Sequence, residues 1–255
     1  WSVAAGVLLL AGADPGTVRA LVKLAWSPMW FLLVFAVLTA ATPVAARLWP
    51  WWPLAAVALV DLVRYGLGGP AWLGWTNVVA AWLVPYCLGA AWGRGELRGR
   101  TSGWVLLVGG AAATAALVRW AGYPAAMVGV PGAAISNQSP PTLAAVTFGL
   151  TQCGVALLLL GPLRRGLRRP AVWAVVALVN LSAMTIFLWH QTALIVVTAI
   201  GLLGGPLPGL HTVPDDPGWL LARLGWLPAF ALALLVCWAA FSAYEHPRSG
   251  TDRRA

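Results

Sequence analysis

Long apolar segments constrain this chain more than any other feature. Seven of them, separated by short connections rich in Pro and Gly, account for most of the 255 residues. The mean hydropathy is +0.81, with 60% hydrophobic and 9% charged residues. A helix needs about 20 apolar residues to cross a bilayer, and backbone polar groups in lipid must be satisfied internally. The sequence therefore predicts an all-α fold, a polytopic transmembrane helical bundle.

Hydropathy and turn residues place the expected spans. They cover residues 29–46, 51–65, 75–92, 104–120, 142–160, 172–203 and 220–241. Tryptophans such as Trp49, Trp104 and Trp219 recur at the ends of these stretches, which is typical of an aromatic belt at the membrane interface. We expect one membrane domain, residues 1–245, followed by a basic tail, residues 246–255.

The basic residues predict the orientation. The formal net charge is +9, and arginines cluster within residues 94–100, 164–169 and 248–254, just outside apolar stretches. By the positive-inside rule these segments face the cytoplasm, so we expect a multi-pass protein of the plasma membrane with a cytoplasmic C-terminus. The 164–169 cluster is interpreted as a topology signal or a contact with anionic membrane lipid. Nucleic acid is not an expected partner, because the sequence has no nucleic-acid-binding module.

The first ten residues are apolar but too short to span a bilayer. They also lack the basic start and cleavage site of a signal peptide. We expect them to be the end of an earlier transmembrane helix, and the chain to be an N-terminally truncated fragment.

No metal or cofactor is expected. The cysteines lie in apolar stretches without CxxC spacing: Cys87, Cys153 and Cys237. They predict neither a zinc site nor a disulfide framework. His211, Asp215 and Asp216 share a Pro-rich loop and could hold a metal, but solvated loop residues are the favoured interpretation.

Polar residues interrupt the apolar stretch 172–203, whose centre reads NLSAMTIFLWHQTAL. Such residues in lipid are costly and often mark functional sites. At 1.5 Å per residue, His190 lies about 27 Å from the start of the stretch, near the outer edge of a ~30 Å core. Two interpretations of His190 stay open, a site residue and an interhelical hydrogen bond.

The length of this stretch also matters. About 32 helical residues would extend roughly 48 Å, so we expect the helix to tilt, break or protrude. In a continuous helix Asn180 and Gln191 share one face, and the opposite face carries Ser182, Thr185, Trp189 and Thr192. Polar groups on both faces predict a helix buried among others or facing a wet cavity; interhelical hydrogen bonding is the favoured role of Asn180.

Two further polar groups are candidates. Asp61 and Arg64 are three residues apart and can pair on one helical face; a structural ion pair is favoured over a functional one. In the loop Ser136-Asn137-Gln138-Ser139-Pro140-Pro141-Thr142, Ser139 can cap the next helix, or the loop can form part of a site. Hydropathy places this loop, the charged pair and His190 all toward the outer leaflet.

Four sequence blocks and their spacing resemble a known family. They are PMWFLLVF from Pro28, YPAAMVGVPG from Tyr123, SNQSPPTLAAV from Ser136 and AMTIFLWHQTAL from Ala183. Through them the chain resembles the membrane acyltransferase family 3, in its actinobacterial form, over residues 1–245.

The resemblance implies a bundle of about ten spans and an integral membrane enzyme. Its expected partners are an acyl-CoA donor, often carrying acetyl, and a hydroxyl-bearing acceptor such as a carbohydrate, glycolipid or natural product. The family's main catalytic His and Arg residues lie in first spans that this chain does not contain, so His190 is a second-rank catalytic candidate. The expected substrate-binding residues are Asp61, Arg64, Ser136, Asn137, Ser139 and Asn180.

Two other classes stay open. A transporter or flippase of a lipid-linked or small hydrophobic substrate also uses buried polar groups and broken helices, but no internally related halves are visible here. A membrane anchor or assembly factor predicts that no intramembrane polar residue affects any activity.

Overall fold

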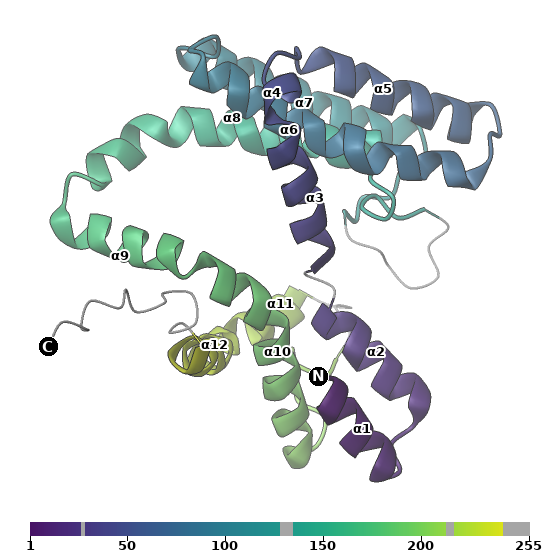
Figure 1. Ribbon diagram of the computed structural model, residues 1–255, viewed down its shortest axis with the longest axis vertical. Coiled ribbons are helices and arrows are strands. Elements are labelled where there is room, and N and C mark those ends of the chain that lie inside the picture. Colours follow the sequence, from purple (N-terminus) through teal and green to yellow (C-terminus); the bar gives the residue numbers. More distant parts are fainter. Residues whose placement is uncertain (27–28, 128–134, 213–216, 242–255) are drawn as a thin grey trace, which may run out of the picture. The chain divides into compact units, whose positions relative to one another are not determined.

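The computed structural model describes residues 1–26, 29–127, 135–212 and 217–241 (Figure 1). Over these ranges the regular elements are helices, and β-pairing is confined to one isolated bridge between Gln138 and Pro141. The chain divides into two compact units. We call Leu33–Arg169 the central unit, and Trp1–Leu32 with Pro170–Ala255 the terminal unit. Each is described by itself.

In the part of the chain that the structure describes, six helical segments are long and apolar enough to cross a membrane, which supports the multi-pass architecture. They are Pro15–Ala40, Ala71–Gly93, Arg100–Trp120, Leu143–Gly166, Ala183–Gly204 and Gly218–Phe241. The first runs over residues 27–28, which lie outside the described ranges.

The expected span at residues 51–65 is not among these six. It forms α5 (Trp51–Asp61, 11 residues) and a π-helical turn, η1 (Leu62–Gly66, 5 residues). At the rise of an α-helix their combined length is about 24 Å, shorter than a ~30 Å hydrocarbon core. The count of seven spans therefore stays a prediction.

The central unit is built from helices that pack around one apolar core. Besides α5 and η1 it contains α4 (Thr42–Ala45), η2 (Ala71–Thr76), α6 (Asn77–Gly93), α7 (Arg100–Trp120) and α8 (Leu143–Gly166), and α3 (Met29–Ala40) leads into it. The core side chains include Val57 from α5, Val84 and Leu88 from α6, Leu106 from α7 and Leu150 from α8. Figure 1 shows α5, α6, α7 and α8 side by side in this unit.

Glycines allow α7 and α8 to approach closely. A Cβ added to Gly110 would lie 2.7 Å from the Thr147 carbonyl oxygen and 2.7 Å from the Thr151 nitrogen. On the facing helix, a Cβ on Gly154 would lie 2.7 Å from the Gly103 carbonyl oxygen. Lipid gives helices no hydrophobic reason to associate, so close packing at small residues stabilises membrane bundles. The α7–α8 pair is therefore the tightest helix contact of the central unit.

The terminal unit is organised around a broken helix. It comprises α1 (Ser2–Leu10), α2 (Pro15–Trp26), α9 (Pro170–Leu181), α10 (Ala183–Gly201), η3 (Leu202–Gly204), α11 (Pro217–Gly225) and α12 (Leu227–Phe241). Helix α10 packs on α12, where the rings of Trp189 and Phe241 stack with centroids 3.9 Å apart. Helix α10 also contacts the N-terminal segment, where Trp1 Nε1 donates a hydrogen bond to Thr192 Oγ1 at 3.1 Å.

The stretch 172–203 breaks at Ser182, which is one of the three outcomes that its length predicted. Ser182 separates α9 from α10 with φ −99° and ψ 7°, and its buried hydroxyl accepts a 2.6 Å hydrogen bond from Trp238 Nε1. The break corrects one inference: Asn180 lies on α9 and Gln191 on α10, so they do not share a face of one continuous helix. Ser182, Thr185, Trp189 and Thr192 instead line the side that meets neighbouring segments.

Leucine at Gly110 should force α7 and α8 apart and destabilise the protein, because its Cβ would overlap the backbone of α8. We expect a loss of about 1–3 kcal/mol, measured by thermal unfolding in detergent. Gly109→Leu is the matched control, because its Cβ meets nothing within 4 Å. Equal melting temperatures for the two variants would contradict the proposed packing.

Candidate functional site

The buried carboxylate of Asp61 is the centre of a polar cluster in the central unit. Asp61 is 2% exposed and ends α5. Its Oδ1 accepts a 2.9 Å hydrogen bond from Asn77 Nδ2, and its Oδ2 accepts bonds from the Tyr123 hydroxyl at 2.9 Å and the Leu143 amide at 2.7 Å. These donors belong to α6, to the connection after α7 and to the start of α8. One side chain thus ties four segments together.

The amide of Leu143 explains why a carboxylate suits this position. Leu143 is the first residue of α8, whose N-terminal N–H groups have no partner within the helix. A carboxylate at a helix N-terminus bonds such a group and interacts favourably with the helix dipole. The cost of burying the Asp61 carboxylate is therefore offset by hydrogen bonds from one helix N-terminus and two side chains.

The prediction that Asp61 and Arg64 form an ion pair is wrong. Over the described ranges the ion pair that forms is Arg94–Glu96, while Arg64 places its guanidinium 4.7 Å from the centroid of the Tyr65 ring. The physical reason is local: the chain changes from α- to π-helical geometry at Leu62, between the two residues. The wider π-helical turn removes the three-residue spacing that would bring them together.

Asn137 organises the loop that precedes α8. It is fully buried, and its Nδ2 donates to the carbonyl oxygens of Pro124 at 2.7 Å and Ala126 at 3.0 Å. Its Oδ1 accepts a 2.8 Å bond from the Thr142 hydroxyl. Both amide hydrogens are used, so Asn137 acts by shaping this loop, and any contribution to substrate binding passes through the loop's shape.

Ser136 and Ser139 present hydroxyls near the surface of the same loop. Ser136 is half-buried and Ser139 is exposed, next to a cis peptide bond between Ser139 and Pro140. Ser139 does not cap α8 as expected. The helix begins later, so the N-cap is Thr142, whose Oγ1 accepts the Ala145 amide at 3.5 Å. This leaves Ser139 available for another role.

The structure confirms that Asp61 and the loop before α8 come together. The Leu143 and Tyr123 hydrogen bonds join them at the end of the central unit where α5 and α7 finish and α6 and α8 start. Asn77 also belongs to this cluster, although sequence reasoning did not select it. It is fully buried, and its Oδ1 has no hydrogen-bond partner. The sequence signal for Asn77 is an asparagine at the start of an apolar helix.

His190 lies on α10 in the terminal unit with an exposed side chain. Its Nδ1 is 2.6 Å from the Phe187 carbonyl oxygen. A carbonyl can only accept, so Nδ1 carries the hydrogen and donates it. In the neutral imidazole the lone pair is then on Nε2, the arrangement that a general base needs.

His211 provides a contrast within the same unit. Its Nδ1 accepts a 3.0 Å bond from the Leu207 amide, and its Nε2 is 2.9 Å from the Thr198 carbonyl oxygen, to which it must donate. Both nitrogens are engaged by backbone, so His211 is structural. Asp215 and Asp216 lie outside the described residues. Within the described ranges no group of three metal-ligating side chains occurs.

Asn180 is exposed near the end of α9, where its Nδ2 donates to the Val176 carbonyl oxygen at 2.9 Å. That bond stays within its own helix. The structure thus brings Asp61, Asn137, Ser136 and Ser139 together in the central unit, whereas His190 and Asn180 belong to the terminal unit.

Over the described ranges, six helical segments of membrane-spanning length define a multi-pass helical membrane protein. The model of the acyltransferase family 3, described as an acyltransferase domain, matches residues 1–242. The chain belongs to this family and is a membrane acyltransferase. No curated protein and no solved structure matches it.

Removing the Tyr123 hydroxyl should lower the free energy of unfolding by about 1–3 kcal/mol, because the bond it donates to a buried carboxylate is lost. Asp61→Asn should cost more, since an amide NH₂ would face the donors of this cluster. Thermal or denaturant unfolding measures both effects. Tyr65→Phe is the control, because the Tyr65 ring packs on Tyr123 without a hydroxyl bond to Asp61. The hypothesis fails if Tyr123→Phe is no more destabilising than Tyr65→Phe.

Proposed function

We propose that this protein transfers an acyl group, acetyl in the simplest case, from an acyl-CoA to a hydroxyl of a carbohydrate, glycolipid or natural product. The observation that carries the proposal is the family match over nearly the whole chain. The side-chain geometry adds a candidate base and a polar loop that the hydrogen bonds of Asn137 hold together.

The reaction sets the requirements of the site. The acceptor oxygen attacks the thioester carbonyl carbon, and a base takes the hydroxyl proton. The tetrahedral oxyanion needs hydrogen-bond donors, and it collapses when the carbon–sulfur bond breaks. The protonated base then returns its proton to the leaving thiolate, so the products are an ester and free CoA.

His190 is suited to the proton transfers in this scheme. The bond from Nδ1–H to the Phe187 carbonyl fixes the tautomer and orients the ring. The Phe187 ring, 5.9 Å from the imidazole between centroids, and the Phe31 ring packed on Phe187 support that orientation. The exposed Nε2 would accept the acceptor's proton.

The other candidate residues fall into two groups. Some have polar groups that could contact a substrate, and others use their polar groups in hydrogen bonds within the protein. Ser136 is half-buried and Ser139 and Asn180 are exposed, so their polar groups could bind the hydroxyls of an acceptor. Asp61 and Asn137 are used internally and would position the loop that carries the serines. Arg64 is half-buried and could offer its guanidinium to a polar substrate group.

Replacing His190 with Ala should lower the rate of acyl transfer by about 10²–10⁴-fold if its Nε2 is the base. His190→Gln should be equally slow, although it retains a donor for the Phe187 carbonyl. Transfer of labelled acetyl from acetyl-CoA to a membrane acceptor measures this, with melting temperatures as the check on folding. Gln191→Ala, at the next position on α10, is the control and should keep its activity. Unchanged transfer in both His190 variants would reduce His190 to a packing residue.

We also propose that the protein resides in the plasma membrane with its basic connections and C-terminus in the cytoplasm, where acyl-CoA is present. The support is the positive-inside distribution of arginines. A Ser249→Cys variant should react with an impermeant thiol reagent only after the cytoplasmic side is opened. The native cysteines are replaced by Ala in this variant to remove background. Labelling of intact cells would overturn the orientation.

A further inference from the structure

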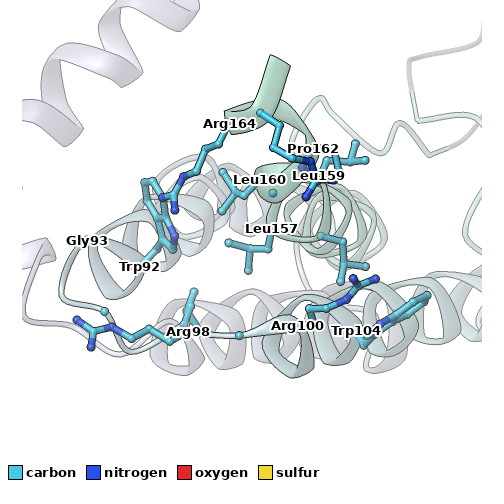
Figure 2. A pocket seen from close by; sticks show the side chains of 16 residues that line it. Trp92, Gly93, Arg98, Arg100, Trp104, Leu157, Leu159, Leu160, Pro162 and Arg164 are labelled. Carbon is cyan, nitrogen blue, oxygen red and sulfur yellow. The ribbon is translucent and has the colours of Figure 1, made fainter. Parts of the chain in front are cut away.

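The central unit contains a groove at the end opposite the Asp61 cluster. It has a volume of about 900 Å³ and lies where α6 finishes, α7 begins and α8 approaches its last turn (Figure 2). All residues that line it belong to the central unit. Nothing in the acyl-transfer scheme above uses this groove.

Four arginines from two separate segments line the groove. Arg98 and Arg100 come from the connection into α7, and Arg164 and Arg165 come from the end of α8. In Figure 2 the side chain of Leu157 lies between Arg164 on one side and Arg98 and Arg100 on the other. The groove therefore has guanidinium groups on two walls. A guanidinium can bind a phosphate through charge-assisted hydrogen bonds.

The positive charge of the groove is not neutralised by nearby carboxylates. Glu96, the acidic residue closest in sequence, forms the ion pair with Arg94, at 2.6 Å between Nε and Oε1. This pair holds the pKa of Glu96 below its usual range, mainly through the Arg94 hydrogen bond. Arg94 also bonds the Ala46 carbonyl. In the part of the chain that the structure describes, none of the four groove arginines forms an ion pair.

Two glycines shape the wall that carries Arg98. Gly95 has φ +81° and lies directly against the Arg98 guanidinium, so a side chain there would displace it. Gly99 has φ +90° and is the N-cap of α7, with no side chain to bond the first N–H groups of that helix. An uncapped helix start beside arginines adds further positive potential.

The rest of the groove is apolar and aromatic. Leu157 packs against the core of the central unit, and Trp92 and Trp104 flank the groove with 44% and 50% of their surfaces exposed. A free inorganic anion would use the arginines alone. A ligand with a phosphate group and an apolar part would use both surfaces.

From this combination we propose that the groove binds a phosphate-bearing amphiphile. The arginines and the start of α7 hold the phosphate, while the leucines and tryptophans hold the apolar part. Two sources offer this chemistry, the phosphates of a CoA thioester and the headgroup of an anionic phospholipid. The inference rests on the groove, and its CoA thioester source rests also on the proposed function, because that thioester is the proposed acyl donor.

If these arginines acted only as a topology signal, each arginine of the cluster would contribute in the same way. Arg168 and Arg169 belong to the same basic cluster as Arg164 and Arg165 but do not line the groove. Charge that serves only orientation or diffuse lipid attraction would make the four equivalent. If the groove is a binding site, Arg164 and Arg165 should contribute to ligand binding, whereas Arg168 and Arg169 should not. The second pair therefore provides a matched control.

The test compares two double variants of equal charge. Arg98→Gln with Arg164→Gln removes one guanidinium from each wall, and Arg168→Gln with Arg169→Gln removes two outside the groove. Each protein is placed in phosphatidylcholine nanodiscs. Equilibrium dialysis measures binding of labelled coenzyme A, and native mass spectrometry measures retention of added phosphatidylglycerol. Both measurements are repeated at low and high salt, and melting temperatures confirm folding.

The groove variant should bind at least one of the two probes tenfold or more weakly than the unmodified protein, and the control variant less than twofold more weakly. Selective loss of coenzyme A binding would identify a CoA thioester as the ligand, and selective loss of phosphatidylglycerol would identify a lipid headgroup. Equal weakening in both double variants, or none in either, would overturn the proposal. His190→Ala should leave binding unchanged, which separates this test from that of the base.

Discussion

The buried carboxylate of Asp61 is the interaction on which the central unit most depends. Burying a charge without a partner costs several kcal/mol, and Asp61 avoids that cost through three donors from three other segments. One of them, the Leu143 amide, belongs to the start of α8 and needs a partner of its own. The same contact therefore compensates a carboxylate and a helix end, and it fixes where α8 begins.

The loop before α8 contains a second hydrogen-bond network next to the Asp61 cluster. Asn137 and Thr142 are fully buried and bond to each other, and Asn137 also holds the Pro124 and Ala126 carbonyls. This network leaves the hydroxyls of Ser136 and Ser139 near the surface of an ordered loop. At the opposite end of the same helices, the groove is lined by arginines, and none of them forms an ion pair with a carboxylate among the described residues. The central unit thus carries two chemically different polar regions separated by an apolar core.

Much of the fold was predictable from the sequence because apolar length and turn residues dominate it. The excess length of the stretch 172–203 predicted that it would tilt, break or protrude, and it breaks. The meeting of Asp61 with the loop before α8 followed from hydropathy. Pairing of Asp61 with Arg64 was mispredicted, because a π-helical turn between them leaves no signal in residue spacing. Asn77, and the division of the 164–169 arginines into groove and outside residues, depend on contacts between helices that no local pattern encodes.

Family membership makes the chain an acyltransferase, and the proposed role of His190 rests on the tautomer that its hydrogen bond to the Phe187 carbonyl selects. The most direct measurement reconstitutes the purified protein in liposomes with labelled acetyl-CoA and hydroxyl-bearing acceptors. It follows free CoA and acetylated acceptor together by mass spectrometry. The account predicts equal molar amounts of ester and free CoA, formed without net movement of unmodified acceptor across the bilayer. Movement of an unmodified acceptor without ester formation would contradict it.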